Sequence, residues 1–335
     1  MNLIKKLKFK YPNEIMLAII LVGVFFFMGL LSPSKFFTVN NIRTMAFQMP
    51  EFGLISLGMM AAILTGGMNL SITSIAALSS ISAAFVLSSD FTKENPALGM
   101  LLAAVVCMAV AIITGLINGA VIAYVGVAAM LVTLGTMTLF EGIGLNLTKG
   151  GSISGFPLAY MKLGNGSMLG IPIPLLIYAL AILVSYFLLE RSNWGVKVYM
   201  TGCNETATRF SGINTKKTLL KVYIFSSAMA GVAGLVLISR YNSAKVDYGS
   251  SYMMQSVAAV VLGGTSITGG HGSVAGTAIA VAIIQVVSTG LNLFGMKRYI
   301  IDIIIGGILI VVLAVRFFSG KYRDSKKAKI QAAHV

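Results

Sequence analysis

The chain has 335 residues, of which 57% are hydrophobic and only 10% are charged, and its mean hydropathy is +0.89. A soluble domain carries roughly 25% charged residues, so this composition excludes an ordinary soluble protein. The net charge of +15 does not indicate nucleic-acid binding, because the basic residues flank apolar segments, and two Cys and two His predict neither a disulfide framework nor a metal site.

Repeated apolar segments predict an all-α polytopic membrane protein with about ten transmembrane helices. Each segment approaches the roughly 20 residues that a membrane helix needs, and the apolar runs are continuous rather than alternating as in a β-barrel. The second and eighth spans are shorter than a full crossing and are candidate half-helices. The expected spans are residues 16–31, 52–64, 72–87, 97–124, 127–147, 168–189, 219–239, 253–262, 274–294 and 299–315.

The basic residues predict that both termini are cytosolic. Most Lys and Arg lie in the N-terminal arm, in a central polar loop over residues 190–221 and in a tail over residues 316–335, as the positive-inside rule requires. Residues 33–50 are expected to form an external linker. The polar segments 149–167 and 240–251 are also expected outside, either as docking surfaces for an extracytoplasmic partner or as plain connecting loops.

Paired glycines end the two short spans and predict the transport site. Unwound backbone in a membrane is tolerated only where it is buried in protein or lines a wet cavity, and short Gly-interrupted segments mark such sites in transporters. The alternative is that the glycines only allow close helix packing. We expect the substrate pathway to include these glycines and nearby uncharged polar side chains: Gly66, Gly67, Asn69, Ser71, Asn118, Gly263 and Gly264.

Two acids, Glu141 and Asp302, are expected inside spans and raise the alternative of an ion-coupled secondary transporter. Arg298 precedes Asp302 by one turn, so a local ion pair is the simpler explanation there. Glu141 lies near the outer end of its span. Uncharged donors and acceptors outnumber these acids, which suits a pathway for a neutral, hydroxyl-rich solute.

The central loop contains a short predicted helix. Asn204 suits an N-cap, Glu205 suits the first turn, and Gly212 lies where a C-terminal glycine is expected. Phe210 resembles a buried residue of this helix. A short helix presented to the cytosol suits a groove of another protein, and the alternative is a helix that lies on lipid.

Five segments in this order resemble the permease subunits of bacterial ABC monosaccharide importers, such as the ribose, xylose and galactoside permeases. The resemblance covers about residues 52–315. It implies a ten-helix, vitamin-B12-importer-like (type II) permease over the single domain 1–335, working as a homo- or heterodimer in the bacterial inner membrane. The segments are GGMNLS from Gly66, GLINGAVIAYVGV from Gly115, VTLGTMTLFEG from Val132, WGVKVYMTGCNETATRFSGINTKK from Trp194 and AAVVLGGTSITGGHGSVAGT from Ala258.

The resemblance also implies partners and residue roles. A separate ABC ATP-binding subunit holds ATP and Mg, and an extracytoplasmic solute-binding protein delivers the solute. This chain has no Walker-type phosphate loop, so we expect it to be neither an enzyme nor a cofactor protein. In the family, the central loop forms the coupling helix that docks on the ATPase, which implies that role for Asn204, Glu205, Ala207, Thr208, Arg209, Gly212 and Ile213.

The chain departs from the family pattern at three places. Asn69 stands where an acid is common, Glu141 stands where a base is common, and residues 127–130 lack a proline. These differences leave the identity of the sugar open. Two alternatives also remain, namely a permease of the same superfamily for nucleosides or branched-chain amino acids, and the ion-coupled carrier.

Overall fold

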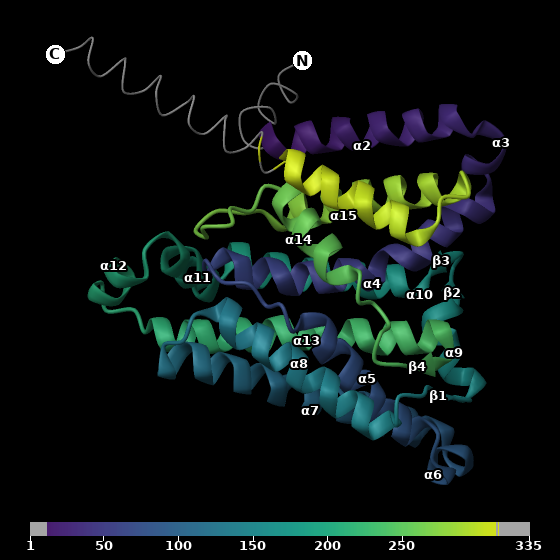
Figure 1. The fold of residues 1–335 in the computed structure, drawn as a ribbon, viewed down its shortest axis with the longest axis horizontal. Helices are drawn as coiled ribbons and strands as arrows, with labels where there is room; N and C mark the ends of the chain where they lie inside the picture. The colour runs from purple at the N-terminus through teal and green to yellow at the C-terminus, as the bar shows by residue number, and fades with distance from the viewer. Residues whose placement is uncertain (1–11, 313, 315–335) are drawn as a thin grey trace.

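Long helices run side by side along one direction in the computed structural model, which describes residues 12–312 and residue 314 (Figure 1). Within those residues, seven helices are long and apolar enough to cross a membrane, which confirms a polytopic helical membrane protein. They are α2 (Pro12–Leu31), α4 (Val39–Leu64), α7 (Pro96–Ala120), α8 (Ala129–Thr148), α10 (Ile173–Tyr186), α13 (Thr215–Tyr241) and α15 (Val274–Leu293).

Two shorter apolar helices, α5 (Ile72–Leu87) and α14 (Tyr252–Leu262), lie among the long ones. π-Helical segments extend α7 through Val121–Val125 and α10 through Phe187–Arg191. The chain is helical again over residues 298–312, within the predicted last span. The predicted basic arm and the tail 316–335 lie outside the described residues.

The connections gather at the two ends of the bundle (Figure 1). One end carries α11 (Asn193–Cys203) and α12 (Glu205–Phe210), which belong to the predicted cytosolic loop. The other end carries α3 (Pro33–Phe36), α6 (Asp90–Glu94), α9 (Leu158–Asn165) and four short strands. Strand β1 (Ile153–Ser154) pairs antiparallel with β4 (Ser243–Ala244), and β2 (Ser167–Met168) pairs with β3 (Ile171–Pro172).

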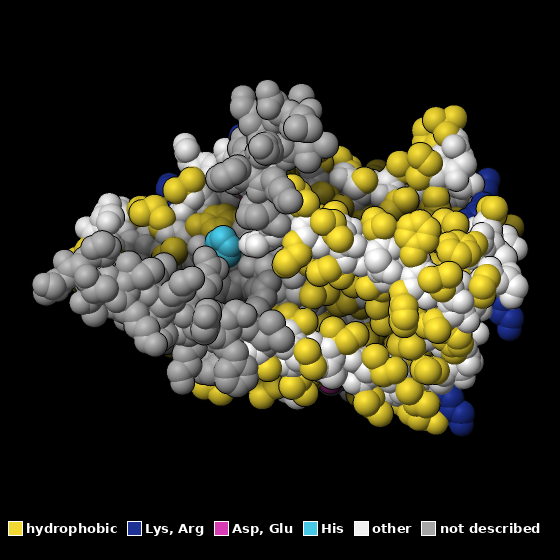
Figure 2. All heavy atoms as spheres, turned by 90° about the horizontal axis from the view of Figure 1, so that it is seen from above, with side chains coloured by type: hydrophobic (Ala, Val, Ile, Leu, Met, Phe, Trp, Pro, Cys, Tyr) yellow, Lys and Arg dark blue, Asp and Glu magenta, His cyan; other side chains and the backbone are white. Residues whose placement is uncertain are grey.

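Burial separates the central helices from those at the periphery. The most apolar stretch of α4 is 83% buried and that of α13 is 72% buried, against 17% for α2. Figure 2 shows hydrophobic side chains over much of this face, with Lys and Arg toward its ends rather than over the middle. Helices that are apolar and yet exposed face lipid or a partner chain, so α4 and α13 form the core of the bundle.

Helix α4 begins at Val39, well before residue 52, so the predicted short second span is wrong. The expected external linker 33–50 is wrong as well, because it holds α3 and the first half of α4. The hydroxyl of Thr38 accepts a hydrogen bond from the amide of Asn41 and starts the helix. Pro50 lies inside α4, where a proline removes one backbone hydrogen bond, and this proline suggested a boundary that the helix does not have.

The sixth span begins later than predicted, because a hairpin precedes it. Strands β2 and β3 occupy the region after residue 166, and α10 starts only at Ile173. Leu169 and Gly170 connect the strands with φ values of +52° and +81°, as a two-residue hairpin turn requires. The eighth span is short, as predicted, since α14 has 11 residues.

A buried ion pair ties α4 to α13 and α14. The Nε of Arg240 lies 2.6 Å from Oε1 of Glu51, and the Glu51 side chain has no exposed surface. The hydroxyl of Tyr252 donates to Oε2 of Glu51 at 2.7 Å. Glu51 is thus a third acid inside a span beside Glu141 and Asp302, and the sequence did not predict it because Pro50 resembles the end of a linker.

Removal of Arg240 alone should destabilise the chain, because it leaves the Glu51 carboxylate buried without its ion partner, at a cost of about 3–5 kcal/mol. We expect Arg240→Met to lower the thermal midpoint of the detergent-purified chain, measured by size exclusion after heating. The double variant Arg240→Met with Glu51→Gln should recover most of that loss. Equal losses in the single and double variants would show that charge balance is not what the pair contributes.

Candidate functional site

Helix α12 has the caps that the sequence predicted. The side chain of Asn204 accepts a hydrogen bond from the first turn at 2.9 Å. At the other end Gly212 has a φ of +83°. The amide of Gly212 donates to the carbonyl of Arg209, and the amide of Ile213 donates to the carbonyl of Thr208. These two bonds form a Schellman motif, so α12 is a defined six-residue helix.

One face of α12 is fixed to α11 and the other is free. The buried hydroxyl of Thr208 lies 2.7 Å from the carbonyl oxygen of Met200, which belongs to α11. Glu205 and Arg209 are exposed, and Phe210 is 83% exposed, so the expectation that Phe210 is buried is wrong. The free surface of α12 therefore combines an acid, a base and an apolar ring.

The two glycine-rich breaks lie against each other and against α11. The amide of Gly270, in the loop between α14 and α15, donates to the carbonyl of Leu64 at the end of α4, at 2.9 Å. A Cβ on Gly202 of α11 would collide with the same Leu64 carbonyl, and a Cβ on Gly269 would lie 2.6 Å from the amide nitrogen of Gly66. Three backbone segments meet here because glycine leaves room for them.

Side chains of the central loop hold the loop that precedes α15. The hydroxyl of Tyr199 donates to the carbonyl of Gly272 at 3.0 Å. Burial, and then the nearby Glu190 carboxylate, raise the pKa of Tyr199, so this phenol stays a neutral donor at physiological pH. The carboxylate of Glu190 accepts a hydrogen bond from the amide of Val274 at 2.7 Å. The central loop is therefore bonded directly to the start of α15.

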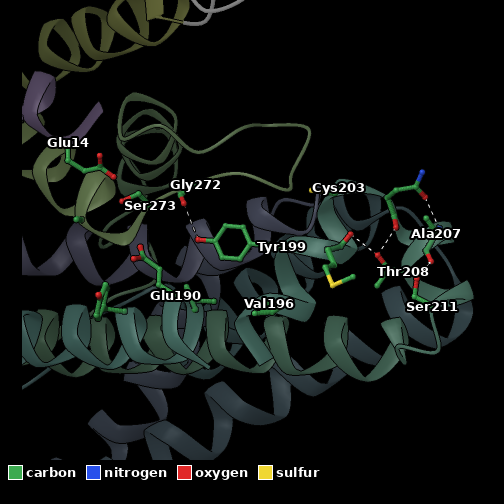
Figure 3. Close-up of a pocket in the computed structure, with 15 residues that line it drawn as sticks. Glu14, Glu190, Val196, Tyr199, Cys203, Ala207, Thr208, Ser211, Gly272 and Ser273 are labelled. Atoms are coloured by element: carbon green, nitrogen blue, oxygen red, sulfur yellow. Dashed lines mark hydrogen bonds between the residues drawn. The ribbon is translucent and has the colours of Figure 1, made fainter. Parts of the chain in front are cut away.

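A cavity of about 1040 Å³ separates part of α11 and α12 from the rest of this end of the bundle. Figure 3 shows Glu190 and Tyr199 next to Gly272 and Ser273, with Thr208 farther along the same cavity. The central loop thus combines packing of α11, whose Val198 is buried in the core, with an open space beside α12.

The three polar residues predicted for the pathway form one chain of hydrogen bonds. Asn118 donates to the hydroxyl of Ser71 at 2.8 Å, and Ser71 donates to Oδ1 of Asn69 at 2.7 Å. Asn69 in turn donates to Ser226 of α13 at 2.9 Å. None of the four side chains has exposed surface. This chain of bonds holds the segment after the first glycine break against α7 and α13, and its place in the pathway stays a prediction.

The predicted pathway glycines are tightly packed in this conformation. A Cβ on Gly67 would lie 2.6 Å from the hydroxyl oxygen of Tyr223, and a Cβ on Gly263 would lie 2.7 Å from the backbone of Thr277. Gly66 and Gly264 have φ values of +79° and +106°, which residues other than glycine adopt rarely. Close packing therefore favours glycine at positions 67 and 263, and the backbone turns after α4 and α14 favour glycine at positions 66 and 264.

Asp302 is held differently from the prediction. Its carboxylate accepts hydrogen bonds from Ser251 at 3.1 Å and from Gln255 at 3.5 Å. In the part of the chain that the structure describes, Asp302 forms no ion pair with Arg298, whose guanidinium lies 6.0 Å from the ring centroid of Tyr252. The acid therefore connects the last helix to α14 through neutral donors, and the predicted local pair is wrong.

The chain is similar to known permease proteins along most of its length. A family model described as "branched-chain amino acid transport system / permease component" matches residues 41–313. An autoinducer 2 import system permease protein LsrD of Photorhabdus temperata is 32% identical, over 92% of both chains. Proteins of the same name from Yersinia enterocolitica and Salmonella typhi are each 33% identical, over 92% of this chain and 93% of theirs. No solved structure gives a significant match.

The contact between α11 and α4 predicts a destabilising effect of Gly202→Ala. The new Cβ collides with the carbonyl of Leu64, and overpacking of this kind costs about 1–3 kcal/mol. We expect a lower thermal midpoint in detergent, measured by scanning fluorimetry. The matched control is Gly23→Ala in α2, where a Cβ meets nothing within 4 Å. Equal midpoints for the two variants would contradict the close approach of α11 to α4.

Proposed function

We propose that this chain, which belongs to the family of branched-chain amino acid transport system permease components, translocates a monosaccharide or a similar hydroxylated solute. It is a permease subunit of an ABC importer in the inner membrane and not an enzyme, and ATP hydrolysis belongs to a separate subunit. The observation that carries the choice of solute is the uncharged polar chain of Asn69, Ser71 and Asn118. A zwitterionic amino acid would need charged partners, and the relatives reported above are named for autoinducer 2.

We infer ten crossings in a type II arrangement. The seven long helices, α5, α14 and the helix over residues 298–312 alternate in direction along the bundle (Figure 1). Helices of 16 and 11 residues, such as α5 and α14, span about 24 and 16 Å, less than the roughly 30 Å of a hydrocarbon core. The glycine-rich segments complete these two crossings. In this arrangement both termini and α12 are cytosolic.

Helix α12 is proposed to dock on the ATP-binding subunit. Its caps keep it rigid, and its free surface carries Glu205, Arg209 and Phe210. Thr208 ties α12 to α11, and α11 contacts the Gly270–Leu64 junction. A shift of α12 during the ATPase cycle would therefore move the ends of both interrupted helices together. The residues proposed for this role are Asn204, Glu205, Ala207, Thr208, Arg209, Gly212 and Ile213.

A second permease is proposed to cover α8. Helices α8 and α4 have similar mean hydropathies of 1.3 and 1.4, but α4 is 83% buried and α8 only 22%. The exposed face of α8 includes Gly135, Thr138 and Gly142, and the two glycines meet nothing within 4 Å of a Cβ. Small and polar residues of this kind are typical of helix–helix contacts or wet cavities in membranes rather than of lipid-facing surface.

The family implies a solute-binding protein. The surface proposed for its docking is formed by segments 149–167 and 240–251 and is called the outer platform. Pairing of Ile153 with Ala244 joins the two segments 149–167 and 240–251, and Asn165 of α9 donates to the carbonyl of Arg240 at 3.2 Å. The platform is thereby attached to the end of α13, a core helix.

Charge reversal on α12 should break the complex with the ATP-binding subunit. We expect the variant Glu205→Arg with Arg209→Glu to lose the subunit during co-purification and to lose ribose uptake in vesicles. The matched control reverses Asp90 and Lys93, an exposed acid–base pair at the opposite end, and should retain both. Uptake that needs an ion gradient, with no ATPase bound to the wild type, would favour the ion-coupled carrier instead.

The dimer proposal predicts a specific cross-link. In a Cys203→Ser background, Thr138→Cys on α8 should be joined to a second permease by a short bis-maleimide, giving a product of doubled mass on a denaturing gel. The control is Leu180→Cys on α10, which is 62% exposed and should remain uncross-linked. The same product from both positions would indicate random collisions and contradict an interface at α8.

A further inference from the structure

A hollow at the end of the bundle opposite α12 has the size of a small-solute site. Its volume is about 370 Å³, and it lies between the first turn of α5, the C-terminal half of α8 and the segment after β4. Pockets for small molecules begin at about 300 Å³, so a hollow of this size has room for one monosaccharide. The residues whose side chains matter below are Thr73, Ser74, Glu141, Lys245, Asp247 and Tyr248.

Glu141 lies in the lining with unused acceptor capacity. Ser74 donates to its Oε1 at 3.4 Å, which is long for a bond to a carboxylate. This is the one hydrogen bond that Glu141 accepts within residues 12–312. A carboxylate offers two oxygens with about four lone-pair positions. Glu141 therefore presents acceptors that suit two neighbouring hydroxyl groups of one solute.

The remaining charges of the lining compensate each other. The ammonium of Lys245 lies 2.9 Å from the carboxylate of Asp247, so the lining residues carry one net negative charge, that of Glu141. This charge repels anions such as sugar phosphates. Tyr248 adds an aromatic ring, held 5.0 Å from the ring centroid of Tyr241. A carboxylate, hydroxyls and an aromatic ring suit a neutral, polyhydroxylated molecule.

The hollow is connected through the chain to the buried hydrogen-bonded network. Thr73 and Ser74 belong to the first turn of α5, and Ser71, the N-cap of the same helix, binds Asn69 and Asn118. A solute that contacts this turn touches the helix whose start is set by the first glycine break. The hollow therefore lies directly beside the segment that joins α4 to α5.

From this geometry we propose that the hollow is a low-affinity receiving site for a neutral polyhydroxylated solute on the outer face, with Glu141 as its principal acceptor. The proposal rests on the proposed function, which places this end of the bundle outside. Glu141 is then a solute ligand rather than a proton carrier.

The test measures protection of a cysteine placed in the lining. The importer is assembled in vesicles with Ser250→Cys in the Cys203→Ser background, and a membrane-impermeant maleimide is added from the outer side. Ribose is the probe, and at twice its dissociation constant it should slow labelling about threefold. Glu141→Gln should abolish the protection. Thr73→Val, which keeps the side-chain shape, should weaken it if Glu141→Gln does not fold, and Asp90→Asn is the control that keeps full protection.

The possible results distinguish failure of the receiving site from failure of the proposed importer function. Ribose 5-phosphate and leucine should leave the labelling rate unchanged, and protection by leucine would overturn the assignment of solute. Equal slowing at Leu169→Cys, on the outer hairpin, would show a general solvent effect and overturn the site. Absence of protection, with ribose uptake and ATPase binding intact, would overturn the site and leave the proposed function standing. If the wild type shows neither ribose uptake nor ATPase binding, both the receiving site and the proposed function would be overturned.

Discussion

The hydrogen bond from the amide of Gly270 to the carbonyl of Leu64 joins the two interrupted helices of the permease. A membrane interior offers no water to an unpaired backbone group, so each helix break needs partners from the protein. The first break receives a further bond, from the hydroxyl of Thr133 to the carbonyl of Met68. The second break bonds to itself, from the amide of Ser266 to the carbonyl of His271. The breaks are therefore fixed structures rather than frayed ends.

This junction also explains why glycines occur both in α11, at Gly202, and in the loop that α11 contacts, at Gly270. Gly202 of α11 fits against Leu64 only without a side chain, and α12 is bonded to α11 through Thr208. The surface proposed for the ATPase and the ends of α4 and α14 thus belong to one connected unit. Adjacent to it, the cavity between α11, α12 and the start of α15 leaves room for this unit to shift. A permease that responds to a distant ATPase needs both properties, a firm connection and space to move.

Local signals in the sequence predicted the parts of the molecule that local chemistry determines. Asn204 and Gly212 cap α12 because their side-chain and backbone preferences act within one turn, and the boundaries of α5 follow directly from an apolar run. Non-local contacts decided the rest. Glu51 is buried in α4 because Arg240 and Tyr252 reach it from distant positions in the chain. The partners of Asp302 also come from another helix.

Hydropathy alone also fails to distinguish helices that are buried by their own chain from helices that need a partner. Helices α4 and α8 have nearly the same hydropathy, yet Glu51 of α4 is paired inside the bundle while Thr138 of α8 lies on an exposed face. In a bilayer, an outward polar face is stable only against protein or water. The hollow beside Glu141 lies along the same helix. If α8 faces a second permease, that hollow opens next to the interface, and a solute released at the outer face reaches the space between the two subunits without crossing the core of either.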